Sequence, residues 1–417
     1  MDLSDALSAP LLRLRAAAEA SARAHPGDRP GRQPVHVVYG GAHLFRHDTM
    51  RKLGDLALRS LDAHAPDADT FADALGLAGG DHRAALYARV RDKLARAPVE
   101  DLRVDFEDGY GQRAPDEEDA RCAAVAEALA RGMREGTLPP AVGIRVRSFA
   151  PETLPRALRT LDLTLTALLR ATGGALPAGF TVTLPKVTLP EEVALLVDAL
   201  DALGARDVAV EVMVESPLAL RPAALPALVA AARGRCAAVH FGAYDYLAAC
   251  GVAGDGSLDH PLCDHARHTM LVALAGTGVR LSDGATAVLP TGPARGEVHR
   301  AWRLHGANVA RALAQGYAQG WDLHPAQLPA RYGAVYDFFL RHADAVGRRL
   351  RAFVERAARA TRDGSVFDDA ATAQGLVNFF LRAVDAGALT DDEAAAHAGV
   401  AVSRLRARSF ASLVGEP

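Results

Sequence analysis

Two carboxylates in this sequence end neighbouring apolar runs, and their residue types point to metal chemistry. Glu215 ends the run Val-Met-Val-Glu, and Asp245 follows the run Val-His-Phe-Gly-Ala-Tyr. If both runs are adjacent parallel strands, the two side chains reach one point, where they repel each other unless a cation lies between them. Oxygen ligands suit magnesium or manganese, with water and substrate oxygens at the remaining positions. We therefore predict that Glu215 and Asp245 hold Mg²⁺ or Mn²⁺.

Charged side chains also end other apolar runs, and their signs alternate along the chain. These residues are Asp105, Glu107 and Asp108 after one run, Arg145 and Lys186 after the next two, and Asp322 and His324 after the last. Arg145 and Lys186 supply positive charge for an anionic substrate. A metal and an arginine beside a keto acid stabilise negative charge that develops on oxygen, as in an enolate.

Short apolar or alternating runs are followed by Ala/Leu-rich helical stretches along most of the chain, which indicates βα units and a parallel sheet. The eight candidate strands are Val35–Gly40, Leu102–Asp108, Val142–Ser148, Phe180–Val187, Val208–Ser216, Ala237–Asp245, Val279–Val288 and Trp321–Gln327. Eight strands close a (β/α)8 TIM barrel. A doubly wound open sheet is the alternative, but the GxGxxG loop typical of its first turn is absent.

In a barrel of this kind the functional residues lie at the carboxyl ends of the strands. Each charged residue also has a structural interpretation: Arg145 could pair with Asp108 to hold the rim, Lys186 could be solvated, and His324 could be a core histidine in a turn. The functional interpretation rests on the whole set, because a barrel that needs only stability has no need of so many charges on one rim. Lys186, Tyr244 and His324 are the candidate substrate contacts from this set.

Helical segments fill the remaining sequence and predict the domain organisation. The predicted helices are Asp119–Met133 and, after the last strand, Tyr332–Thr361, Ala370–Ala386 and Asp391–Leu405. The segment 51–98, between the first two strands, is long enough for extra helices that decorate the barrel. We predict a catalytic barrel domain over residues 1–330 and a C-terminal helical extension over residues 331–417.

Composition excludes several classes of function. Half of the 417 residues are hydrophobic, 23% are charged, and the formal net charge is −3, which argues against a general nucleic-acid binder. The cysteines Cys122, Cys236, Cys250 and Cys263 are scattered, so a zinc site is not expected and a reduced cytoplasmic protein is the simpler interpretation. Neither a signal peptide nor an apolar run long enough to span a bilayer is visible, so no membrane partner is expected.

Six motifs of the chain, taken together, resemble those of a known superfamily. In order, they are DFEDGYG, GIRVRSFAPE, TLPKVTLPEE, VMVESPLAL, FGAYDYLAA and GWDLHPAQL. Their order and spacing over roughly residues 102–330 resemble the HpcH/HpaI aldolase and citrate lyase superfamily, nearest to its citrate lyase beta-like and malyl-CoA lyase members. The segment Gly284–Pro290, GATAVLP, is also similar to malate synthases, which share the barrel and the metal site.

The resemblance implies specific roles for the residues that match the motifs. Glu215 and Asp245 match the magnesium ligands, and Arg145 matches the arginine that contacts the carbonyl or enolate oxygen of a keto acid. Glu107 and Asp108 match acidic residues that orient this arginine and the waters of the metal. In this superfamily the common step is chelation of the keto acid by the metal through its carboxylate and carbonyl oxygens.

Further roles follow from the resemblance in the loop after the sixth strand and in the C-terminal segment. Gly242 and Ala243 match small residues that let the backbone approach the substrate. Asp368 matches an aspartate, often from a neighbouring subunit, that acts as general acid or base in some relatives, although an N-cap of the following helix is an equally good interpretation. The chain departs from the superfamily at Arg147, where Asn is common, and at the tyrosines Tyr244 and Tyr246.

The function that these features imply is a magnesium-dependent carbon–carbon lyase or Claisen-type condensing enzyme. Its substrate would be a 3-hydroxyacyl-CoA, or an acyl-CoA with a small keto acid such as glyoxylate or pyruvate. The alternatives are an aldolase that cleaves a free hydroxy-keto acid, phosphoenolpyruvate-type chemistry with Arg147 as a phosphate ligand, and a non-catalytic barrel. Relatives with this barrel often form trimers or hexamers, so the resemblance also implies a homo-oligomer.

Overall fold

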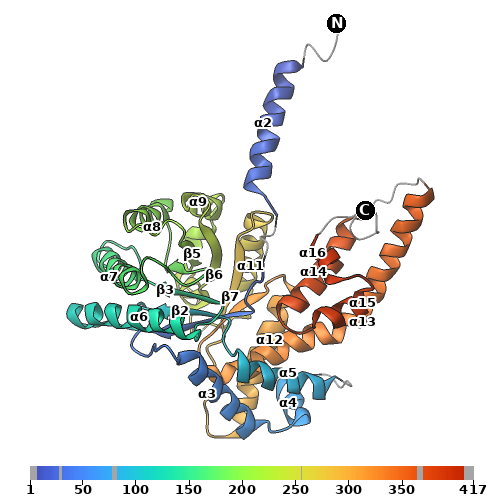
Figure 1. Cartoon of the computed structure of the whole chain (residues 1–417), viewed down its shortest axis with the longest axis horizontal. Coiled ribbons are helices and arrows are strands. Elements are labelled where there is room, and N and C mark those ends of the chain that lie inside the picture. The colour runs from blue at the N-terminus through green and yellow to red at the C-terminus, as the bar shows by residue number, and fades with distance from the viewer. Residues whose placement is uncertain (1–6, 28–30, 78–81, 255, 364–369, 408–417) are drawn as a thin grey trace.

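The computed structural model describes residues 7–27, 31–77, 82–254, 256–363 and 370–407. Within them, eight parallel strands form a closed barrel in chain order, and β1 completes it by pairing with β8 (Figure 1). They are β1 (His36–Gly41), β2 (Asp101–Asp105), β3 (Ala141–Arg145), β4 (Thr181–Leu184), β5 (Ala209–Val214), β6 (Cys236–Phe241), β7 (Arg280–Ala285) and β8 (Gln319–Asp322). The predicted (β/α)8 TIM barrel is confirmed, and the open doubly wound sheet is excluded.

Helices connect the strands and cover the outside of the barrel. Three of them lie between β1 and β2: α3 (Thr49–His64), α4 (Ala68–Leu75) and α5 (Arg83–Arg96). The others up to β8 are α6 (Pro115–Glu135), α7 (Leu154–Thr172), α8 (Pro190–Ala202), α9 (Ala224–Ala231), α10 (Ala243–Ala249), α11 (Pro261–Leu274) and α12 (Arg295–Ala314), with a 3₁₀ turn, η1 (Pro217–Leu220), after β5. Proline in the first turn of α6 and α8, followed by acidic residues, suits a helix start because proline presets the backbone and acids favour the helix dipole.

Alternation along each strand separates the apolar core from a polar barrel interior. In β2, Val104 packs in the main hydrophobic cluster, while Arg103 on the opposite face is buried inside the barrel. The Arg103 guanidinium donates hydrogen bonds to Glu211 of β5 at 2.8 Å and to Asp101 at 3.2 Å. Each of these three buried charges thus has a partner of opposite sign, which is the condition for burying charged groups without a large penalty.

All of the strands except β1 end earlier than the sequence predicts, and this places the site residues in or after loops. The predicted strand Leu102–Asp108 ends at Asp105, whose carboxylate accepts hydrogen bonds from the N–H groups of Glu107 and Gly109 and turns the chain. The predicted strand Ala237–Asp245 ends at Phe241, because Ala243 already begins α10. The carboxylates therefore stand just beyond the strand ends.

The C-terminal part of the chain is helical and packs on one side of the barrel. After the 3₁₀ turn η2 (Pro325–Gln327), the helices are α13 (Leu328–Asp363), α14 (Ala370–Asp385), α15 (Asp391–Ala398) and α16 (Val402–Arg406). The single predicted helix Asp391–Leu405 is wrong: Gly399, with φ of 70°, ends α15 in a left-handed turn. The predicted domain boundary near residue 330 falls inside α13 and stays a prediction.

A further helix, α2 (Ser8–Ala24), projects away from the barrel in Figure 1, and none of its residues is buried. This helix was not among the elements predicted from the sequence. Across the described ranges, no helix has both the length and the apolar composition needed to cross a membrane.

Candidate metal centre

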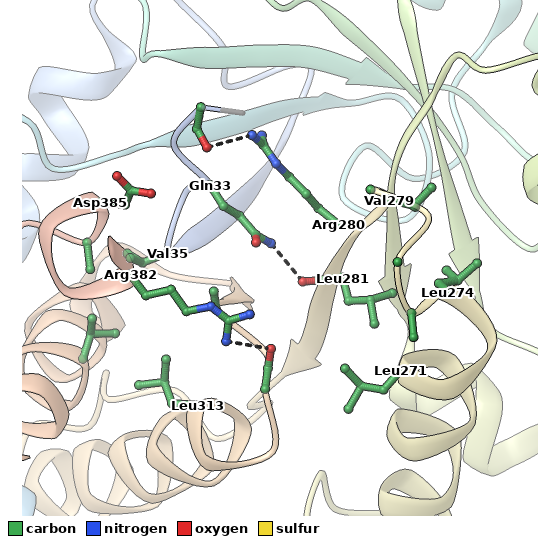
Figure 2. Close-up of a pocket in the computed structure, with 18 of the residues that line it drawn as sticks. Gln33, Val35, Leu271, Leu274, Val279, Arg280, Leu281, Leu313, Arg382 and Asp385 are labelled. Carbon is green, nitrogen blue, oxygen red and sulfur yellow. Dashed lines mark hydrogen bonds between the residues drawn. The ribbon is translucent and has the colours of Figure 1, made fainter. Parts of the chain in front are cut away.

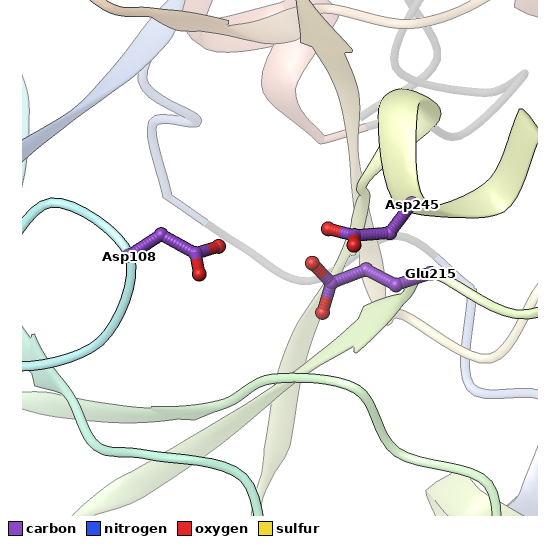
Figure 3. A group of neighbouring side chains, drawn as sticks. All are labelled: Asp108, Glu215 and Asp245. Atoms are coloured by element: carbon purple, nitrogen blue, oxygen red, sulfur yellow. The ribbon is translucent and has the colours of Figure 1, made fainter. Parts of the chain in front are cut away.

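Three carboxylates meet at the carboxyl end of the barrel. Asp108, Glu215 and Asp245 each offer an oxygen within 4.8 Å of the others, and Figure 3 shows their three side chains together. Asp108 comes from the loop after β2, Glu215 follows β5, and Asp245 lies in the first turn of α10. The structure thus brings together the predicted pair Glu215 and Asp245 and adds Asp108 as a possible third ligand. Their binding of a metal stays a prediction.

Glu215 is fixed by the backbone around it. It is buried, and its Oε2 accepts a hydrogen bond of 2.6 Å from the backbone N–H of Lys186. Lys186 holds this N–H in place with φ of 55°, a left-handed conformation that costs a non-glycine residue about 1–2 kcal/mol. Ser216, the next residue, starts η1 by accepting a hydrogen bond from Leu218. Strain at Lys186 is of the kind found at functional sites.

Gly242 leaves the space that the Glu215 side chain occupies. A Cβ at Gly242 would lie 2.3 Å from Cγ of Glu215 and 2.9 Å from its Oε1. We expect Gly242→Ala to displace the carboxylate and to weaken Mg²⁺ binding by roughly tenfold or more, because a ligand moved by an ångström no longer meets the ion. Calorimetric titration of Mg²⁺ measures this. Gly375→Ala in α14 is the matched control, since its Cβ would meet nothing within 4 Å, and unchanged Mg²⁺ affinity of Gly242→Ala would contradict the assignment.

The position of Asp245 depends on its neighbour Tyr244. The Tyr244 hydroxyl donates to the carbonyl of Ala285 at 3.1 Å and accepts from the N–H of Ala287 at 2.7 Å. These bonds tie α10 to the end of β7, so the predicted substrate contact Tyr244 has its hydroxyl engaged within the protein. Ala243, buried at the start of α10, and Gly242 form the short turn between β6 and this helix.

The electrostatics of the cluster favour a cation. The pKa of Glu215 is raised to about 8, chiefly by burial and also by the nearby charges of Glu107 and Asp245, against the opposing effect of Arg145. Burial raises the pKa of Glu107 in the same way. A pKa raised by like charges marks a place where a positive ion would be stabilised.

Arg145 is held by carboxylates from the loop after β2. Its Nε and Nη2 donate to the two oxygens of Asp105 at 2.7 and 2.5 Å, and its Nη1 lies 3.0 Å from Oε2 of Glu107. The predicted partner Asp108 is 3.9 Å away, so it is the weakest of the three contacts. Sequence analysis placed Asp105 at the strand end without a role. Its bidentate geometry on Arg145, the usual arrangement of an arginine with a carboxylate, could not be read from spacing.

Lys186 bridges two acidic residues beside the carboxylate cluster. Its Nζ contacts Oε1 of Glu107 and lies 3.1 Å from Oδ1 of Asp108. Burial lowers the pKa of Lys186, but its hydrogen bond to Glu107 and the surrounding carboxylates outweigh burial and raise it above the usual value. The ammonium group is therefore a fixed positive charge next to the site.

The remaining predicted residues lie outside this cluster or outside the described residues. His324 caps η2, where its Nδ1 accepts from the N–H of Ala326 at 3.1 Å, and burial lowers its pKa. This geometry matches the structural interpretation of a histidine in a turn, and a substrate contact is untested. Arg147 donates to Glu118 at 2.9 Å, and its predicted role as a phosphate ligand stays untested. Asp368 falls outside the residues that the structure describes.

A separate cavity of about 200 Å³ lies at the other end of the barrel (Figure 2). Val35, Val279 and Arg280, which stand before or at the amino ends of β1 and β7, line it together with Leu313 and Arg382. Active sites of this fold sit at the carboxyl ends of the strands, so this cavity is not the candidate site.

Comparison of the sequence with family models gives a match over nearly the whole chain. Residues 14–413 match the family described as Domain of unknown function (DUF6986). The chain belongs to the DUF6986 family. No curated protein shows significant similarity to this DUF6986 chain.

Solved structures similar to the DUF6986 chain are of two kinds. The protein CitE of Mycobacterium tuberculosis, in complex with magnesium and acetoacetate, is 17% identical over 73% of this chain and 90% of its own, with a TM-score of 0.42. The malate synthase of Haloferax volcanii, in its native form at 3 mM glyoxylate, is 16% identical over 94% and 98% of the two chains, with a TM-score of 0.49. A magnesium and glyoxylate complex of the same enzyme is 15% identical over 93% and 99%, with a TM-score of 0.47. At these identities and TM-scores, what these proteins bind does not transfer to the DUF6986 chain.

Proposed function

We propose that this chain is a magnesium-dependent carbon–carbon lyase or Claisen-type condensing enzyme that acts next to a keto acid. The observation that carries the proposal is the meeting of Asp108, Glu215 and Asp245 within 4.8 Å, beside an arginine oriented by two carboxylates. The carboxylate cluster and the guanidinium of Arg145 lie at the carboxyl end of the barrel, where active sites of this fold are found. An aldolase acting on a free hydroxy-keto acid remains the second candidate, because nothing in the cluster itself distinguishes a thioester from a free acid.

The residues present fit a hard divalent cation. All three candidate ligands are carboxylates, the donors that Mg²⁺ and Mn²⁺ prefer, and two of them are exposed, which leaves room for water or substrate oxygens. When bound, such an ion supplies a Lewis acid that polarises a carbonyl oxygen. Asp108 can bind the ion directly or through a water molecule. Lys186 also contacts this carboxylate, so the ion and the ammonium group would share it.

The chain's own groups account for charge stabilisation in the reaction. In cleavage, a hydroxyl proton leaves, its C–O bond becomes the carbonyl of the keto acid, and the electron pair of the broken C–C bond ends on the enolate of the other product. Arg145 donates hydrogen bonds to the oxygen that carries developing charge, and Asp105 and Glu107 hold the guanidinium in place for this. We propose that Asp368, supplied by a neighbouring subunit of a trimer or hexamer, carries the proton.

A substrate panel tests the proposed function. The purified protein with Mg²⁺ is incubated with 3-hydroxyacyl-CoA thioesters and with free hydroxy-keto acids, and the released keto acid is trapped as a hydrazone. Release from thioesters alone supports the lyase, and release from free acids alone supports the aldolase. No product from either set, together with no condensation of acyl-CoA with glyoxylate or pyruvate, would overturn both and favour phosphoenolpyruvate chemistry or a non-catalytic barrel.

Metal binding should depend on pH through Glu215. Because its pKa is raised to about 8, the metal-free side chain carries a proton at neutral pH, and this proton must leave before the carboxylate binds an ion. We expect Mg²⁺ affinity to rise by up to about tenfold per pH unit as pH increases toward 8 and then to level off. Calorimetric titrations across this range measure it. Glu215→Gln, which has no proton to lose, should show a flat profile, and a flat wild-type profile would contradict the expectation.

A further inference from the structure

The guanidinium of Arg145 lies against two aromatic rings that sequence analysis did not single out. Its Cζ is 4.9 Å from the centroid of the Tyr39 ring and 5.5 Å from that of Trp321. The rings come from β1 and β8, neighbours across the closure of the barrel, and their centroids are 4.3 Å apart. Met213 of β5 completes this layer, with Sδ 3.7 Å from Nη1 of Arg145. The layer forms a floor beneath the carboxylates at the strand ends.

The rings constrain the arginine in a way that its ion pairs do not. Asp105 engages one edge of the guanidinium through Nε and Nη2, and Glu107 lies beside Nη1, but both carboxylates act at the edges of the guanidinium and neither covers its faces. Ring faces attract a cation most strongly where water is excluded, and the Arg145 side chain is 1% exposed. Contact with Tyr39 and Trp321 therefore holds the plane of the guanidinium, so that Nη1 stays beside Glu107.

The rings are themselves anchored from other strands. The Tyr39 hydroxyl lies 3.1 Å from Nδ1 of His240 in β6, and the two rings meet edge to face. His240 lies in turn 3.5 Å from Glu211, which is paired with Arg103 in the barrel interior. Tyr39 thus joins the charged pairs inside the barrel to the layer that contacts Arg145.

We propose that Tyr39 and Trp321 are positioning residues that hold Arg145 in the orientation needed to contact a keto-acid oxygen. The proposal rests on the proposed function, because it assumes that Arg145 is the substrate contact. Neither ring needs to touch the substrate. Trp321 and Tyr39 then act on binding through the geometry of Arg145, and their effect should vanish when the guanidinium is absent.

A double-mutant cycle tests this, with pyruvate as the probe in the presence of Mg²⁺ and binding measured by calorimetry. Trp321→Leu removes the ring face, whereas Trp321→Phe and Tyr39→Phe keep an aromatic face beside Arg145. We expect Trp321→Leu to weaken pyruvate binding by roughly 5- to 30-fold, the range of a buried cation–π contact, and the Phe variants to stay within about threefold of wild type. In the Arg145→Met background, where no cation faces the ring, Trp321→Leu should weaken binding no further.

Each outcome decides between distinct explanations. If Trp321→Leu weakens pyruvate binding equally with and without Arg145, the ring contacts the substrate or only supports the fold, and the positioning role is overturned. If pyruvate binds the wild-type protein and Trp321→Leu binds it equally well, the positioning role is also overturned, but the proposed function is not affected. Absence of pyruvate binding in the wild-type protein, for which glyoxylate is the second probe, would overturn the proposed function and the positioning role together. Thermal unfolding of each variant identifies any that fails to fold, and if Trp321→Leu does not fold, Tyr39→Leu, which removes the other ring face, carries the cycle.

Discussion

Glu215→Gln and Asp245→Asn should each abolish magnesium-dependent turnover while the barrel stays folded. Both changes keep the shape of the side chain and remove the negative charge, so a cation loses the oxygen that attracts it. Glu215→Gln should not weaken the metal-free fold, because its buried carboxyl is already protonated below about pH 8. We expect Mg²⁺ affinity to fall by at least about a hundredfold, the scale of losing one charged ligand near the ion.

Calorimetric Mg²⁺ titration and turnover of any substrate found in the panel measure this result. Asp108→Asn is the graded comparison: its side chain also pairs with Lys186, so a smaller loss would indicate contact with the metal through water. Glu191→Gln, at an exposed position in the first turn of α8, removes a carboxylate of the same kind remote from the cluster. Normal magnesium-dependent turnover in Glu215→Gln would show that the metal assignment is wrong.

Arg145→Met should lower activity strongly and also destabilise the protein. The substitution leaves Asp105 buried at 1% exposure without its bidentate partner, and breaking a buried pair in this way costs about 3–5 kcal/mol. Loss of the guanidinium at an oxygen with developing charge should lower turnover by about 10²- to 10³-fold. Chemical denaturation and steady-state kinetics measure the two effects separately.

The double variant Asp105→Asn with Arg145→Met separates stability from chemistry. Without the unpaired carboxylate, much of the lost stability should return, whereas activity should not, since the guanidinium is still missing. If restored stability brought activity back, Arg145 would be a structural residue of the rim only, and the proposed contact with a keto acid would be incorrect.

The sequence determined the barrel and the residue types at its rim. Apolar runs alternate with helical stretches, and side chains alternate along each run, so Arg103 and Val104 must face opposite sides of β2. Because parallel strands all end on one rim, the placement of Glu215 and Asp245 after successive strands was enough to predict that they meet. The order of the strands in the sequence is sufficient for this prediction, because neighbouring strands of such a barrel follow each other along the chain.

Only the tertiary structure decided which residues surround those carboxylates. Asp108 joins them because Asp105 accepts two backbone N–H groups and turns the loop toward β5, a local bond that no periodicity reports. Tyr39 and Trp321 meet Arg145 because β1 and β8, the first and last strands, pair where the barrel closes. Such contacts depend on how the sheet curves and on where each loop turns. Sequence patterns predict only the face of the strand on which a side chain lies.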